Sequence, residues 1–159
     1  MTARNVDLDS LARPHWTDQE RANAALAADF VRLLMNEHDF DAVRERFGEG
    51  SYVQHNHGIA DGLEGVLATI QNLIKRFPEY GYDVKTVLVD GDTVVFHSHA
   101  TLRGAHVGDD RRGFNITDRW RVEEGKLVEH WDSIQPMDRF GRFYALLTGG
   151  TVRNANGTY

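Results

Sequence analysis

The spacing of the apolar residues changes from helical to alternating at Pro78, and this change limits the fold more than any other feature of the chain. Before Pro78, apolar residues recur every three or four positions, which predicts helices over about 17–37 and 61–77 and a shorter one over 40–47. Thr17 and Glu20 have the spacing of a capping box, so we expect the first helix to begin there. Pro78 ends the third helix because proline lacks the N–H that would continue it.

After Pro78 the apolar residues alternate with polar ones, which is typical of strands. Segments 82–90 and 93–103 flank Gly91-Asp92, and segments 114–123 and 126–134 flank Glu124-Gly125, so we expect two hairpins joined by a polar loop over 104–113. A short strand over 52–56 and a last helix over 140–147 complete the prediction. Helices followed by antiparallel strands predict an α+β fold, with three N-terminal helices on one face of a curved antiparallel sheet. We expect one domain over 1–159, with an N-terminal arm (1–14) and a C-terminal short helix and tail (137–159).

Composition excludes several classes of partner. The net charge is −6 and no basic cluster is longer than Arg111–Arg112, which argues against binding to nucleic acid or to an anionic membrane. No apolar run approaches the roughly 18 residues that span a bilayer. The N-terminus lacks the apolar stretch of a secretory signal, so we expect a cytoplasmic protein. The absence of cysteine excludes disulfides, thiolate metal sites and a cysteine nucleophile.

Strand alternation in the second hairpin gathers ionisable residues on one side. Asp118, His130 and Asp132 share a side with apolar neighbours that include Ile116, Trp120 and Val128, because residues of like parity face the same way. The opposite side is mostly charged and holds Arg119, Arg121, Glu129 and Trp131. We therefore expect Asp118, His130 and Asp132 to face the concave, helix-covered interior.

The strand over 93–103 offers two faces, and either could be buried. His97 and His99 lie on one side, whereas Phe96 and Leu102 lie on the other. Placing the histidines inward gathers five ionisable groups at one depth, and we adopt this arrangement as the simplest. Phe96 and Leu102 would then face outward with Trp131 as an apolar patch, which predicts a homodimer contact.

These groups suit acid/base chemistry on a small carbonyl-containing or hydrophobic substrate. A carboxylate among apolar walls has a raised pKa and accepts protons near neutral pH, while a nearby imidazole supplies the acid. We therefore expect Asp118 to take a proton from carbon next to a carbonyl, with His97, His99 or His130 stabilising the enolate and Asp132 beside them. We expect the substrate pocket to be shaped by Tyr52, His55, Trp120, Ile116 and Phe30.

Two alternatives stay open on the residues alone. His97 and His99 present two imidazoles on one strand face, and His55, His130 or Asp132 could add a third ligand for a divalent metal, which would suit a hydrolase or lyase. The other alternative is a non-catalytic protein that binds a small hydrophobic ligand. The leading hypothesis needs no cofactor.

Several segments resemble the SnoaL-like polyketide cyclase group of the nuclear-transport-factor-2-like superfamily, over about residues 17–136. They are Tyr52-Val-Gln-His-Asn56, Ala60-Asp-Gly-Leu-Glu-Gly65, Val94-Val-Phe-His-Ser-His99, Asp118-Arg-Trp-Arg-Val122 and Gly125-Lys-Leu-Val-Glu-His-Trp-Asp-Ser-Ile-Gln-Pro136. The resemblance implies a cone of curved antiparallel sheet wrapped by three helices, usually as a homodimer. It also implies that Asp118 is the general base, assisted by His97 or His99, in an intramolecular aldol condensation without a cofactor. The superfamily also contains dehydratases, isomerases and ligand binders, so the fold alone does not determine the reaction. From the acid/base residues we expect an enzyme of the lyase or isomerase class.

Overall fold

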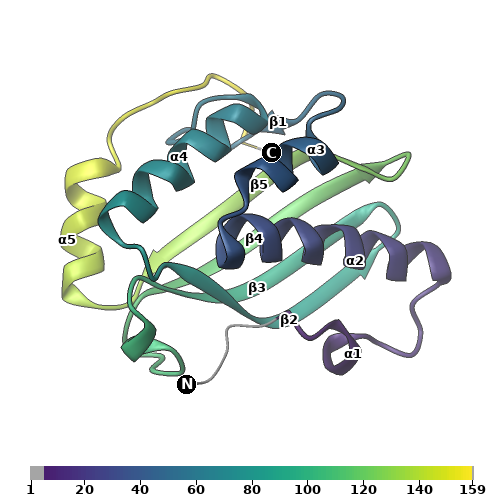
Figure 1. Cartoon of the computed structure of the whole chain (residues 1–159), viewed down its shortest axis with the longest axis horizontal. Helices are drawn as coiled ribbons and strands as arrows, with labels where there is room; N and C mark the ends of the chain where they lie inside the picture. The colour runs from purple at the N-terminus through teal and green to yellow at the C-terminus, as the bar shows by residue number, and fades with distance from the viewer. Residues whose placement is uncertain (1–5, 159) are drawn as a thin grey trace.

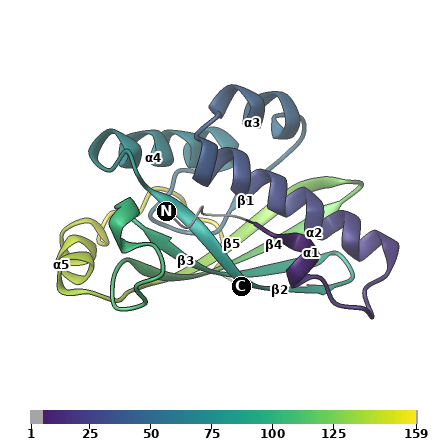
Figure 2. The same cartoon turned by 60° about the horizontal axis from the view of Figure 1, so that its bottom comes forward.

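The computed structural model describes residues 6–158 and has helices layered on one face of a curved, open five-stranded sheet (Figures 1 and 2). The strand order is β1-β5-β4-β3-β2, so the three antiparallel pairings join strands that follow one another along the chain from β2 to β5. This arrangement confirms the predicted α+β class. The sheet is mixed rather than antiparallel throughout, because β1 runs parallel to β5.

The helices begin and end at the residues that the sequence predicts, within a few positions. α2 (Asp18–Val31) begins at the Thr17 capping box and continues as a π-helix, η1 (Arg32–Glu37). α3 (Phe40–Phe47) is capped by Asp39, and α4 (Gly62–Arg76) ends before Pro78. α2 and α4 lie over the sheet, whereas α3 packs beside η1 on the outer side of the helices (Figures 1 and 2). Their buried apolar residues include Phe30, Val43 and Leu67.

The strands are β1 (Val53–Gln54), β2 (Gly81–Asp90), β3 (Thr93–Thr101), β4 (Phe114–Glu123) and β5 (Lys126–Pro136). A short 3-10 helix, η2 (Gly104–His106), lies in the loop between β3 and β4. The turn between β4 and β5 needs two left-handed residues, and Glu124 and Gly125 both have positive φ. α5 (Arg139–Thr148) lies beyond the end of the sheet, at the left in Figure 1, where the ring of Phe140 contacts Phe77, which follows α4.

Two local expectations are corrected. The N-terminal segment is not a featureless arm, because Leu8–Leu11 forms a helical turn, α1, that Asp7 caps and that packs Leu8 and Leu11 against the core. Residues 1–5 of the expected arm lie outside the described residues. In β5, a bulge pairs Val122 with Leu127, so Leu127 is buried and Val128 is only half-buried. Val128 therefore does not share the interior with His130, because the bulge shifts the alternation by one residue.

Candidate active site

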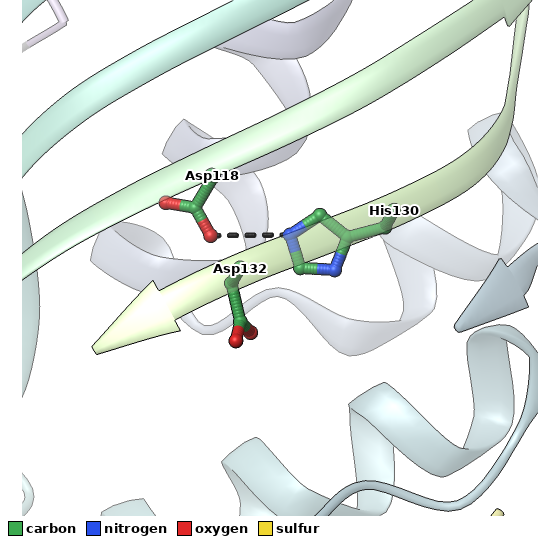
Figure 3. Close-up of side chains that lie close together, drawn as sticks. All are labelled: Asp118, His130 and Asp132. Carbon is green, nitrogen blue, oxygen red and sulfur yellow. Dashed lines mark hydrogen bonds and ion pairs between the residues drawn. The ribbon is translucent and has the colours of Figure 1, made fainter. Parts of the chain in front are cut away.

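Asp118, His130 and Asp132 lie side by side on the concave face of the sheet, as strand alternation predicts (Figure 3). Asp118 on β4 stands directly opposite Asp132 on β5, and Trp120 stands opposite His130. Asp118 is 1% exposed and His130 is 5% exposed. Two carboxylates directly opposite each other would repel, and the His130 imidazole lies beside them and contacts Asp118 (Figure 3).

Gln54 fixes the proton of His130 on one nitrogen. The Gln54 Oε1 accepts the backbone N–H of Asn56 at 2.9 Å, which leaves the Gln54 amide nitrogen to donate to His130 Nδ1 at 3.0 Å. Nδ1 is therefore the acceptor, and the ring proton is on Nε2, which donates to Asp118 Oδ1 at 3.1 Å.

The pKa of Asp132 is raised. Burial raises the pKa of Asp132 above its ordinary value, and the charge of Asp118 raises it further, while His130 and a hydrogen bond from Asn56 Nδ2 to Asp132 Oδ1 oppose the shift. Asp118 instead accepts a hydrogen bond from His130 Nε2 at Oδ1. Two neighbouring carboxyl groups with different surroundings are an arrangement that divides acid and base roles.

Aromatic side chains enclose the imidazole and the two acids. The Trp120 ring stacks on His130 with centroids 5.1 Å apart, and Phe30 stacks on Tyr52 at 5.9 Å. The Tyr52 hydroxyl accepts a hydrogen bond from Trp120 Nε1, and burial raises the pKa of this phenol well above its usual range. Ile116 is also buried on this face. Phe30, Tyr52, Trp120 and Ile116 are therefore buried in this interior, and their part in a substrate pocket stays a prediction.

Two buried oxygens in this interior have no hydrogen-bond partner within residues 6–158. They are Asp118 Oδ2 and the Ser98 hydroxyl, and both residues are 1% exposed. Ser98 pairs with Ile116 and therefore lies on the same face as Asp118, on the adjoining strand. Leaving a buried polar atom unpaired costs about 1–3 kcal/mol, so these two oxygens are sites where a polar group of a ligand would be stabilised.

The inward placement of His97 and His99 is wrong. Phe96 pairs directly with Asp118, so Phe96 shares the concave face and is fully buried, packing against Trp120 with centroids 5.3 Å apart. The histidines consequently face the opposite side, where His97 is exposed and donates from Nε2 to Asn115 Oδ1. His99 donates from Nε2 to the carbonyl of Arg112 at 2.8 Å.

The reason for this inversion is apolar burial. The face that carries Phe96 also carries Val94, Ala100 and Leu102, and all four are buried. Burying one phenylalanine removes about 150–250 Å² from water, worth about 4–6 kcal/mol at about 25 cal/mol per Å². Neither histidine needs the concave interior, because each finds a polar partner on the outer face. Phe96 and Leu102 therefore do not form the outward patch on which the dimer prediction rested.

His55 also lies on the outer face rather than in the substrate site. Its ring stacks on Trp131 with centroids 4.3 Å apart, and Arg119 covers the Trp131 ring at 3.9 Å. Alternation explains the placement: Tyr52 and Gln54 face inward, so His55 cannot.

The C-terminal tail holds the segment between β1 and α4 from outside. Asn154 Nδ2 donates to the carbonyls of Asn56 and Ile59, and Asn156 Nδ2 donates to the carbonyl of Gln54 at 2.8 Å. His55 and His57 donate to the carbonyls of Gly157 and Asn156. The tail therefore supports the two residues, Gln54 and Asn56, that contact His130 and Asp132.

The predicted metal ligands His97, His99 and His55 do not meet. Within the described part of the chain, the group whose ligand atoms come together is Asp118, His130 and Asp132, whose ligand atoms all lie within 4.8 Å of one another. A metal on His130 Nε2 would need the proton on Nδ1, facing the Gln54 amide that donates there. The hydrogen-bond pattern of the donor set therefore opposes a metal at this position.

Sequence reasoning missed Gln54, Asn56 and Ser98. Gln54 and Asn56 have the same parity as Tyr52, and this signal was available once Tyr52 was placed inside. Their partners His130 and Asp132 lie 76 residues further along the chain, and no local pattern reveals that parallel pairing. Ser98 follows from the corrected face of β3.

An open curved sheet with helices on one face and acid/base residues on the concave side is the architecture of the nuclear-transport-factor-2-like proteins. Within this class, the pattern of the SnoaL-like domain matches residues 27–130, and the chain belongs to that family. No curated protein matches the chain. None of the helices in residues 6–158 combines the length and apolar character needed to cross a membrane.

Solved structures show the same fold. A candidate polyketide cyclase from Bacillus cereus ATCC 10987 is 21% identical, with a TM-score of 0.64 over 88% of this chain and 89% of that one. AclR, a candidate hydroxylase from Streptomyces galilaeus, is 17% identical, with a TM-score of 0.57 over 86% and 89%. A candidate SnoaL-like polyketide cyclase from Jannaschia sp. CCS1 is 18% identical, with a TM-score of 0.56 over 91% and 100%. At these identities the likeness establishes the fold alone.

Proposed function

We propose that the protein is an acid/base enzyme that removes a proton next to a carbonyl group and catalyses an aldol-type cyclisation or a related isomerase or lyase step. The observation that carries the proposal is the buried Asp118–His130 pair, in which one carboxylate oxygen is held by the imidazole and the other has no hydrogen-bond partner in residues 6–158. The free oxygen lies in the concave interior and is the atom that would take the proton. Family membership and the cyclase names of two structural neighbours support the same reaction class.

The three groups would divide the work. Asp118 Oδ2 takes the proton from carbon, and the electron pair moves to the carbonyl oxygen. Asp132, whose pKa burial raises, donates its proton to that oxygen, which yields an enol. His130 keeps its single proton throughout and positions Asp118, because Gln54 occupies its other nitrogen.

The cyclisation restores both acids. The enol returns its proton to Asp132 while its carbon attacks a second carbonyl of the same molecule. The oxygen of that second carbonyl takes the proton from Asp118. One carbon–carbon bond forms, no atom leaves, and neither an oxidant nor a cofactor is consumed.

The experiment is deuterium incorporation from D₂O at the carbon beside the carbonyl of 2-tetralone, followed by NMR. We expect Asp118→Asn to lower the enzymic rate by about 10²–10⁴ while the fold is kept, because the amide cannot accept the proton. Asp90→Asn, at the exposed end of β2, is the matched control and should exchange at the wild-type rate. Equal rates in wild type and Asp118→Asn would remove the proposal.

A divalent-metal hydrolase or lyase is the second candidate: the grouping of Asp118, His130 and Asp132 favours it, whereas the Gln54 amide at His130 Nδ1 opposes it. It predicts stoichiometric metal in protein purified without a histidine tag, and inhibition by chelators. Elemental analysis separates the two candidates, because the first needs no metal.

We also propose that the protein is a homodimer and that it is cytoplasmic. The homodimer now rests on the family resemblance and on the exposed apolar residues of α5, which include Phe143, Leu146 and Leu147. The cytoplasmic location rests on the sequence alone.

A further inference from the structure

A cavity of about 370 Å³ lies at the end of the sheet where α4, α5 and the loop between β3 and β4 meet. Its apolar wall is formed by Phe77, Leu102, Phe114 and Phe140. Arg103, Arg112 and His106 line the same cavity from the loop between β3 and β4. Flat apolar walls beside basic side chains are suited to an aromatic molecule that carries a negative charge.

The guanidinium groups of the two cavity arginines are not paired with a carboxylate in residues 6–158, and neither lies over an aromatic ring there. Asp109 interacts electrostatically with Arg112 but forms its ion pair with Arg111, whose Nε lies 2.8 Å from Asp109 Oδ1. Arg103 and Arg112 are therefore available to an anion that enters the cavity.

Asp138, the acid in the cavity wall, is engaged by the backbone. Its Oδ1 accepts the N–H of Gly141 at 2.7 Å, and its Oδ2 accepts the N–H of Gly113 at 3.3 Å. Asp138 therefore caps α5 and ties it to the start of β4, rather than pairing with the arginines.

The cavity and the acid/base group lie along one face of the sheet. Phe114 of the cavity wall and Asp118 have the same parity on β4, so both face the concave side, four residues or about 13 Å apart. Between them lies an apolar cross-strand pair, in which Ile116 is buried and Ile134 is 50% exposed. A rigid molecule of three or four linearly fused rings has the length to reach from one to the other.

We propose that this cavity binds the anionic end of the substrate, a carboxylate on an aromatic or polycyclic skeleton, and places its remote carbonyl at Asp118 and Asp132. The inference rests on the proposed function for the identity of the reacting end, whereas the carboxylate site itself is a binding property that can be measured separately. Charge-assisted hydrogen bonds contribute about 1.5–3 kcal/mol, which corresponds to about tenfold to a hundredfold in affinity.

The test is calorimetric titration of the full chain with 2-naphthoate and with 2-naphthamide, which has the same shape without the charge. We expect the acid to bind at least tenfold more tightly than the amide, and the double variant Arg103→Gln/Arg112→Gln to lose that preference. The control is Arg76→Gln/Arg139→Gln, which removes the same charge from exposed positions outside the cavity and should keep the preference. Phe140→Ala, at a half-exposed wall position, should weaken both probes alike.

Three results would overturn the proposal: equal affinity for acid and amide, a preference that survives in Arg103→Gln/Arg112→Gln, or no binding of 2-naphthoate at millimolar concentration. Asp118→Asn separates this proposal from the proposed function. It should bind 2-naphthoate as the wild type does even though exchange at carbon is lost. If the wild type incorporates deuterium into 2-tetralone but binds 2-naphthoate no more tightly than 2-naphthamide, the carboxylate site alone is refuted.

Discussion

Replacing Gln54 by leucine removes the amide that holds His130 in one tautomer, while it keeps most of the side-chain volume. Gln54 is fully buried, and its loss leaves His130 Nδ1 and the N–H of Asn56 without partners. Each buried unpaired group costs about 1–3 kcal/mol, so we expect the free energy of unfolding to fall by about 2–6 kcal/mol. A domain of this size has about 5–15 kcal/mol of stability, so the variant should still fold at low temperature.

The tautomer itself is read by ¹⁵N NMR of the imidazole. In the wild type, Nδ1 should resonate as an unprotonated nitrogen and Nε2 as a protonated one at pH 7. In Gln54→Glu, the new carboxylate would accept a proton from Nδ1, and we expect both ring nitrogens to be protonated, with His130 charged between two acids. Gln71→Leu, at a half-buried position on α4, is the control and should leave the spectrum unchanged. A wild-type spectrum with Nδ1 protonated would refute the assignment of roles around His130.

Three further predictions concern Asp132, the tail and assembly. The pKa of Asp132 is higher in the folded than in the unfolded state, so this residue stabilises the fold fully below the unfolded-state pKa and loses that contribution as pH rises through the folded-state pKa. In urea unfolding from pH 4 to 8, the wild type should therefore lose stability relative to Asp132→Asn, by about 1.4 kcal/mol for each pH unit between the two pKa values. A stability difference that does not change with pH would contradict this. Deleting residues 151–159 should speed hydrogen exchange at the Asn56 N–H, since Asn154 and Asn156 hold that segment; unchanged protection would show that the tail does not support the site. Light scattering should report a dimer at micromolar concentration, and a monomer would remove the dimer prediction.

The local spacing of apolar residues was enough to predict the helices and strands and to bring three residues of the candidate site together. The change of period at Pro78 separates helices from strands, and alternation along β4 and β5 places Asp118, His130 and Asp132 together because antiparallel partners of like parity share a face. It could not choose a face for β3, where both sides mix apolar and polar residues. The four apolar side chains around Ser98 decide that choice, and weighing their burial against two imidazoles would have placed His97 and His99 outside.

Other features depend on contacts that no local pattern contains. The bulge that buries Leu127 in place of Val128 is a property of the pairing between β4 and β5. Gln54 and Asn56 reach the site through the parallel pairing of β1 with β5, and the tail that supports them comes from about 100 residues further along the chain. Arg103 and Arg112 are neighbours of Phe140 in space through the position of α5, not through any motif.

The carboxylate of Asp118 is the centre of the proposed chemistry, and chemical rescue tests it most directly. Asp118→Ala removes the base and leaves a space of the size of a small carboxylate beside His130 Nε2. We predict that this variant loses exchange at the carbon beside the carbonyl of 2-tetralone by about 10²–10⁴, and that added formate restores it whereas formamide does not. Exchange at the wild-type rate in Asp118→Ala without formate would contradict the assignment of Asp118 as the base.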